Sequence, residues 1–274
     1  MVLTYTTAVG EQGSLVVFLH GLFGQGRNWT QVAKALADPE RPDPHRALLV
    51  DLPHHGRSGW PDRFDYLQVA DQVADQVAES LDGDEPVALV GHSLGGKVAM
   101  VLALRHPRLV ERLCVVDVSP VAYDRLSDFT AYVAAMRGLD LDALVQRADA
   151  DAALTQGVPD PTVRGFLLQN LRRDGDGWRW QMNLGVLGDS LPQIGSWPEE
   201  QLAGLAPYDG PVLWVAGERS DYVKPEYAGP MDRWFPRNRL VRVKNAGHWV
   251  HSEQQDVFVE VLRRFLSGRT PSGA

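Results

Sequence analysis

The chain has 274 residues, a formal net charge of −8 and 44% hydrophobic residues, with Cys114 as its single cysteine. The acidic balance argues against a nucleic-acid-binding protein, which needs a basic surface. One cysteine excludes a disulfide framework and a multi-cysteine metal site. The length suits one large domain, or one domain that carries an insertion.

Apolar runs, taken in chain order, predict buried strands at 15–19, 47–50, 87–90, 113–116, 212–215 and 240–243. Uninterrupted apolar runs are typical of strands that are covered on both faces, as in parallel sheets. The first run is too short for a signal peptide or for a membrane span, which needs roughly 20 apolar residues. We therefore expect a cytoplasmic protein without a membrane span.

Apolar residues recur at helical spacing between these runs, at 67–81, 98–104 and 257–266, and Gly268 is placed to end the last helix. Strands that alternate with helices predict an α/β fold with a mostly parallel central sheet flanked by helices. The alternation stops between residues 121 and 207, where helical patterns occur at 129–136, 139–145 and 163–171. We therefore expect a core of residues 1–120 and 208–274 and a helical insertion of residues 121–207.

The strongest chemical signal is Gly91-His92-Ser93-Leu94-Gly95, a G-x-S-x-G motif between a predicted strand and a predicted helix. In this context the serine occupies a sharp turn that exposes its hydroxyl, and the flanking glycines leave room for the turn. The N-terminus of the following helix offers N–H groups and a partial positive charge to an oxyanion. The motif predicts Ser93 as a nucleophile, and the alternative is an ordinary turn with a serine cap.

A glycine-bearing loop, His20-Gly21-Leu22-Phe23-Gly24, follows the first predicted strand. A loop at this position can supply the second N–H group of an oxyanion hole. We predict that the amides of Leu22 and Leu94 form this hole. The alternative is a plain turn that leads into the next helix.

His248 follows the last predicted strand, on a loop from which an imidazole can reach the serine as general base. A carboxylate must then orient the imidazole. Asp117 ends the run 113–116 and Asp221 lies in the loop after 212–215, and both keep the order Ser, Asp, His. The chemistry of the two residues alone does not decide which of them orients the imidazole.

The chain resembles the α/β-hydrolase superfamily, and within it the YbfF-type esterases and thioesterases. The matching segments are HGLFG at 20–24, DLPHHGRS at 51–58, GHSLGGKVAM at 91–100, RHPRLVERLCVVDVSPV at 105–121, WRWQMNL at 178–184 and AGHWVH at 246–251. The resemblance implies an α/β-hydrolase fold whose insertion forms a helical lid after the sixth strand. In this branch the acid follows the strand after the nucleophile helix, which favours Asp117. Asp221 stays the alternative, because most other α/β-hydrolases keep their acid near its position.

The resemblance also implies a serine hydrolase that cleaves carboxylic esters or thioesters of small to medium acyl groups. Ser93 would form an acyl-enzyme and His248 would move the proton, without a metal or another cofactor. The expected partner is a small-molecule ester or thioester. Two other functions stay open. The same triad could serve C–C bond hydrolysis or perhydrolysis, or the chain could bind a small molecule without catalysis.

The residues that we expect to contact the substrate are Phe23, His92, Trp178 and Trp249. Other residues of the insertion that suit an acyl pocket are Phe129, Tyr132, Met136, Phe166, Leu167 and Trp180. Arg172, Arg173 and Arg179 either hold the phosphates of a coenzyme A thioester or form a solvated surface. Three arginines are an ordinary surface density, which favours the solvated surface.

Overall fold

The computed structural model describes residues 4–81, 85–123 and 127–268, which contain a seven-stranded sheet of order β1-β3-β2-β4-β5-β8-β9. Neighbouring strands are parallel except for the antiparallel pair of β1 and β3. The strands are β1 (Tyr5–Val9), β2 (Leu15–Leu19), β3 (Arg46–Asp51), β4 (Val87–His92), β5 (Val110–Val116), β8 (Val212–Gly217) and β9 (Asn238–Val243). All six apolar runs lie in strands, which confirms the predicted α/β class and the mostly parallel sheet. The run 240–243 is not buried as expected, because β9 lies at the edge of the sheet, where Leu240 is exposed.

Strand β1 is the strand of the seven-stranded sheet that the sequence patterns did not predict. Its sequence, Tyr-Thr-Thr-Ala-Val, contains no apolar run, and its residues are exposed or half-buried. It lies at the edge of the sheet, where one side pairs with β3 and the other pairs with no strand of the described sheet. An edge strand needs less burial than a central one, so β-branched and aromatic residues suffice to form it.

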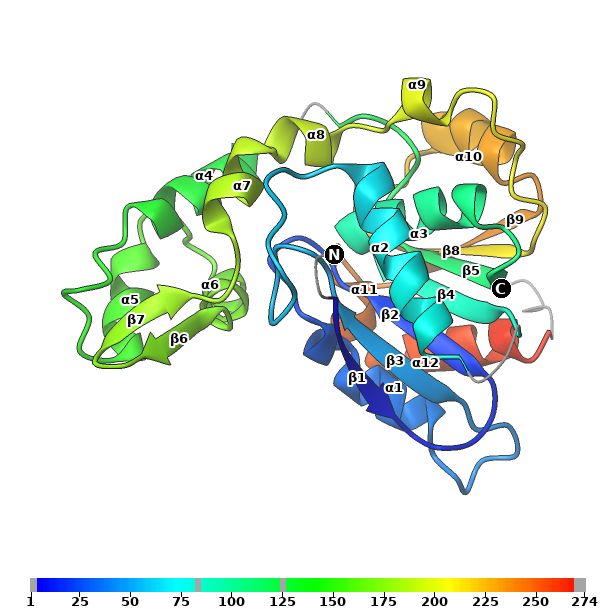
Figure 1. Ribbon diagram of the computed structural model, residues 1–274, viewed down its shortest axis with the longest axis horizontal. Helices are drawn as coiled ribbons and strands as arrows, with labels where there is room; N and C mark the ends of the chain where they lie inside the picture. The colour runs from blue at the N-terminus through cyan, green and yellow to red at the C-terminus, as the bar shows by residue number, and fades with distance from the viewer. Residues whose placement is uncertain (1–3, 82–84, 124–126, 269–274) are drawn as a thin grey trace.

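Helices cover both faces of the sheet (Figure 1). One face packs against α1 (Thr30–Leu36) and α12 (Gln255–Leu266), and the other against α2 (Tyr66–Glu79) and α3 (Leu94–Arg105). Alternate residues of each central strand join the two apolar clusters, which explains the uninterrupted apolar runs. In the described part of the chain, no helix is both long enough and apolar enough to pass through a bilayer.

The segment that follows β5 extends to one side of the sheet (Figure 1). Its elements are α4 (Ser127–Arg137), α5 (Arg147–Leu154), α6 (Pro161–Leu168), β6 (Leu171–Asp174), β7 (Gly177–Trp180), α7 (Leu184–Asp189), α8 (Leu191–Gly195) and α9 (Glu199–Leu202). Two expectations are corrected. The segment follows the fifth strand along the described chain instead of the sixth. It is also not purely helical, because β6 and β7 form an antiparallel hairpin around Gly175, whose φ of +58° suits glycine.

The predicted helix at 139–145 is also wrong, because these residues form turns and α5 begins only at Arg147. The Asp140 carboxylate accepts hydrogen bonds from the amides of Asp142 at 3.2 Å and Ala143 at 3.3 Å. Such local bonds offer the backbone an alternative to the helix. The predicted helix at 163–171 also ends early, because α6 ends at Leu168 and Leu171 already belongs to β6.

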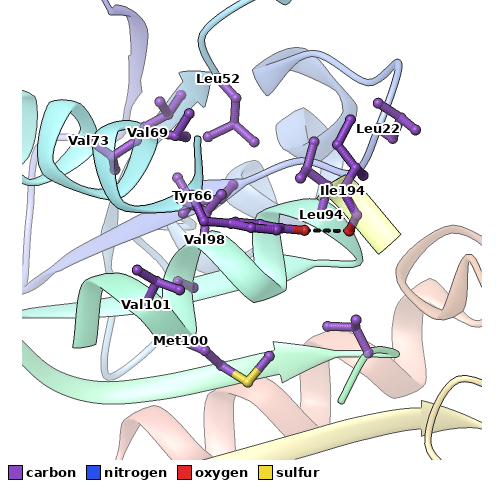
Figure 2. Close-up of a cluster of buried hydrophobic side chains, with 14 of the residues drawn as sticks. Leu22, Leu52, Tyr66, Val69, Val73, Leu94, Val98, Met100, Val101 and Ile194 are labelled. Carbon is purple, nitrogen blue, oxygen red and sulfur yellow. Dashed lines mark hydrogen bonds between the residues drawn. The ribbon is translucent and has the colours of Figure 1, made fainter. Parts of the chain in front are cut away.

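The carboxyl end of α8 is held by side chains of the core. Figure 2 shows the Tyr66 hydroxyl directed at the Ile194 carbonyl, to which it donates at 2.6 Å. The Lys97 ammonium of α3 donates to the carbonyls of Gly195 at 2.7 Å and Ser196 at 2.6 Å. These bonds satisfy carbonyl groups that the end of a helix leaves without helical partners. They fix the place where the chain returns from the insertion to the core.

Candidate active site

Ser93 lies on the turn between β4 and α3, with φ of 52° and ψ of −117°. A positive φ is rare for a residue with a side chain and marks a strained backbone. The turn is possible because Gly95 packs directly on the backbone at the end of β2. A Cβ atom there would lie 2.5 Å from the carbonyl oxygens of Leu19 and His20. The structure therefore gives Ser93 the sharp turn that the G-x-S-x-G motif predicts.

His248 lies in the loop between β9 and α11 (Val250–Glu253) and pairs with Asp117. Its Nδ1 is 2.7 Å from Oδ2 of Asp117 and donates to it, since a carboxylate is an acceptor. Asp117 is fully buried directly after β5. Its carboxylate also accepts from the amide of Gly217 at 3.0 Å and from the hydroxyl of Ser220. Three donors therefore hold one carboxylate in place against the imidazole.

Asp221 occupies a different environment from Asp117. It is exposed to solvent in the loop after β8, and the carboxylate hydrogen-bonded to His248 in the described chain belongs to Asp117. Its neighbour Tyr222 packs on the imidazole, with ring centroids 4.3 Å apart. Tyr222 is a site residue that the sequence analysis did not find, because a tyrosine in a loop carries no sequence signal of this role.

Ser93 and His248 line the same cavity, which has a volume of about 310 Å³. Its other lining residues include the predicted Phe23, His92 and Trp249 and, from the insertion, Phe129, Tyr132, Val163, Phe166 and Leu167. Trp178 is not among them. Its indole donates to the Leu144 carbonyl at 3.1 Å, and the guanidinium of Arg173 lies 4.3 Å above its ring. The structure therefore does not bring Trp178, Met136 or Trp180 to this cavity.

The amides of Leu22 and Leu94 lie in the two segments that border Ser93. Leu94 is the first residue of α3, so its amide has no acceptor within the helix. In the other loop, the Phe23 amide donates to His55 at 3.2 Å and the Gly24 amide to the Gly21 carbonyl at 2.9 Å. Among the described residues no acceptor takes the Leu22 amide, and it stays available to a ligand.

Buried histidines surround the site and stay uncharged at neutral pH. Burial lowers the pKa of His20 to about 4 and that of His251 to about 3. Burial also holds the pKa of His92 well below its ordinary value, and its Nε2 donates to the His248 carbonyl at 2.9 Å. These rings therefore position the loops around His248 without adding positive charge to the site.

Comparisons with known proteins agree with this architecture. Residues 14–255 match the family described as the alpha/beta hydrolase fold. The chain is 37% identical over 256 residues to a mouse (Mus musculus) protein named sn-1-specific diacylglycerol lipase ABHD11, with 92% of this chain and 80% of that protein covered. It is 30% identical over 260 residues to Esterase YbfF of Escherichia coli (strain K12), with 94% of each covered. A solved structure named as a marine microorganism esterase superposes with a TM-score of 0.89 at 30% identity, covering 97% of this chain and all of that one.

Proposed function

The chain belongs to the alpha/beta hydrolase fold family, and on this premise we propose that it is a serine hydrolase of carboxylic esters or thioesters. One observation carries the proposal. Ser93, on its strained turn, and His248, which is hydrogen-bonded to the buried Asp117, line one cavity. The esterase and diacylglycerol lipase names of the similar proteins support hydrolysis of an ester.

The proposed mechanism is acyl transfer through Ser93. Asp117 occupies Nδ1 of His248, which leaves Nε2 to take the proton as the serine oxygen attacks the carbonyl carbon. The oxyanion that forms accepts from the amides of Leu22 and Leu94, each worth about 3–4 kcal/mol in the transition state. His248 then returns the proton to the leaving alcohol or thiol. The same imidazole afterwards deprotonates the water that cleaves the acyl-enzyme.

We assign the acyl group to the apolar side of the cavity. Phe129, Phe166 and Leu167 line it from the insertion, and Phe23 and Trp249 line it from the core. A volume of about 310 Å³ supports acyl groups of small to medium size. In this proposal residues 121–207 act as a lid, because they complete the apolar wall that excludes water from the ester.

The test is turnover of p-nitrophenyl acetate, butyrate and octanoate by the wild type and Ser93→Ala. We expect the substitution to lower kcat/KM by about a thousandfold or more, because it removes the nucleophile. The matched control is Ser267→Ala, an exposed serine at the end of α12, which keeps full activity. Turnover that survives in a folded Ser93→Ala protein contradicts the proposal. A wild type inactive on both esters and acyl thioesters favours a binding protein instead.

A further inference from the structure

A second cavity, of about 280 Å³, is lined by side chains of both the core and the hairpin of the insertion. Two arginines of the lining come from the core: Arg57, and Arg27 of the short helix η1 (Gly26–Trp29). A third, Arg172, comes from β6. We propose that this arginine cavity binds a phosphate group of an anionic ligand. The proposal concerns binding only and does not depend on the hydrolase mechanism.

The charge of the arginine cavity is opposite to that of the chain. Its lining contains three guanidinium groups and one carboxylate, that of Asp51, in a protein with a net charge of −8. The Asp51 carboxylate is already occupied by the amides of Gly26 at 2.6 Å and Arg57 at 2.9 Å. In the part of the chain that the structure describes, no carboxylate forms an ion pair with Arg27, Arg57 or Arg172.

The three guanidinium groups are oriented by neutral partners, and each uses one N–H donor in the hydrogen bonds of the described residues. Arg27 donates to the Gln169 carbonyl at 2.9 Å. Arg57 donates to the Tyr5 hydroxyl at 2.7 Å, and Arg172 donates to the Gln181 side chain at 2.7 Å. Each guanidinium has five N–H donors in a planar fork that matches the oxygens of a phosphate. One used donor per group leaves enough for charge-assisted bonds to a ligand.

The arginines also repel one another. Burial lowers the pKa of Arg27 and of Arg172, and the nearby charges of Arg57 and Arg147 lower both further, while the Asp51 carboxylate acts in the opposite direction on Arg27. Arg147 is itself anchored to the carbonyls of Leu168 and Leu171. A group of like charges destabilises the folded chain, and a bound anion reduces the repulsion.

The active-site cavity has the opposite character. The carboxylates of Asp128 and Asp160 line it, and its lining contains no arginine or lysine among the described residues. An anion therefore gains more from the arginine cavity than from the catalytic one. The two cavities share one loop, because Gly24 lines the first and Gln25 lines the second.

The test is calorimetric titration of Ser93→Ala protein with inorganic pyrophosphate at low salt, so that no hydrolysis contributes to the heat. Arg57→Gln or Arg172→Gln, each added to Ser93→Ala, should weaken binding by about tenfold or more, the factor expected for a lost charge-assisted hydrogen bond. The matched control is Arg179→Gln. This arginine lies on β7, pairs with Asp174 at 3.4 Å and does not line the cavity.

A second arm distinguishes a soluble phosphate from a lipid headgroup. It measures flotation of the same proteins with phosphatidylcholine vesicles, with and without phosphatidic acid. Pyrophosphate binding that depends on Arg57 and Arg172 supports a soluble ligand. Flotation that needs phosphatidic acid and is lost in the same variants supports a headgroup. The proposal is overturned if neither probe binds, or if the Arg179→Gln control loses as much affinity as the cavity variants.

Discussion

Two residues of the candidate site share an unusual backbone. Ser93 and Asp117 each have a φ of 52° and each directly follows a central strand. Both turns are held by bonds that continue the sheet. The Ser93 amide donates to the Val116 carbonyl, and the Asp117 amide to the Val215 carbonyl, both at 3.0 Å. Strain of this kind persists only where the surroundings over-determine it, as these bonds between adjacent strands do.

The triad acid is tested by comparing Asp117→Asn with Asp221→Asn. We expect Asp117→Asn to lower kcat by roughly 10³- to 10⁴-fold, because an amide no longer fixes the tautomer of His248 or stabilises the imidazolium. Asp221 is exposed, so Asp221→Asn should stay within about twofold of the wild type. The measurement is steady-state turnover of p-nitrophenyl butyrate. Loss of kcat in folded Asp221→Asn alone would refute the assignment.

At the scale of elements, the start of α3 is the most constrained junction. All residues of α3 except Arg105 are buried, and its first turn lies against the loop that holds Leu22. A Cβ atom on Gly96 would lie 2.6 Å from a methyl group of Val118 and 3.0 Å from the Gly91 carbonyl. Close approach of α3 to β4 and β5 therefore depends on small residues in this turn.

A pair of glycine substitutions tests this junction. Gly95→Ala places a methyl group against backbone oxygens that cannot move aside, so we expect the free energy of unfolding to fall by about 1–3 kcal/mol or more. Gly165 lies within α6 with no atom within 4 Å of its Cβ position. Gly165→Ala should therefore raise the free energy of unfolding by roughly 0.5–1 kcal/mol. Urea denaturation followed by circular dichroism measures both changes. Equal effects of the two substitutions would show that α3 is not packed as described.

At the scale of the whole molecule, two of the places where hydrogen bonds join the insertion to the core involve buried side chains. One is the carboxyl end of α8, which Tyr66 and Lys97 hold. The other is Asn170, which is fully buried between α6 and β6. Its amide donates to the Phe23 carbonyl at 2.7 Å and accepts from the Gln25 side chain at 2.6 Å. The insertion therefore bonds directly to the loop that carries the Leu22 amide.

The stability of the molecule should fall in mild acid. Histidines of the unfolded chain bind protons below a pH of about 6.5, whereas folded His20 and His251 bind them only near their lowered pKa values of about 4 and 3. The unfolded state then holds more protons, so the free energy of unfolding decreases as the pH falls from about 6.5 toward 4. Between pH 7 and pH 5 we expect a loss of roughly 2 kcal/mol for each of the two histidines.

Urea denaturation at pH 7 and pH 5 checks this expectation. The comparison variant is His251→Phe, which keeps a ring beside Trp29, where the two wild-type centroids are 4.2 Å apart. Phenylalanine binds no proton, so the difference between the two pH values should shrink in this variant. An unchanged difference would mean that His251 does not contribute to the acid sensitivity.

Local patterns in the sequence were sufficient for the central strands, for α2, α3 and α12, and for the Ser93 turn. These features depend on residues that are close in the chain, because periodicity and turn chemistry act over a few positions. The family resemblance favoured Asp117 over Asp221. The residue chemistry alone left the two equal, since both follow parallel strands at the same edge of the sheet.

Tertiary structure decided the features that join distant segments. His248 meets Asp117 across 131 positions of sequence, and Asn170 meets Phe23 across 147. Tertiary structure also decided that β1 pairs with β3, that the segment around Gly175 forms a hairpin and that Trp178 lies away from the cavity. Such contacts depend on how strands pair and how loops pack, and each is selected by partners that no local pattern contains.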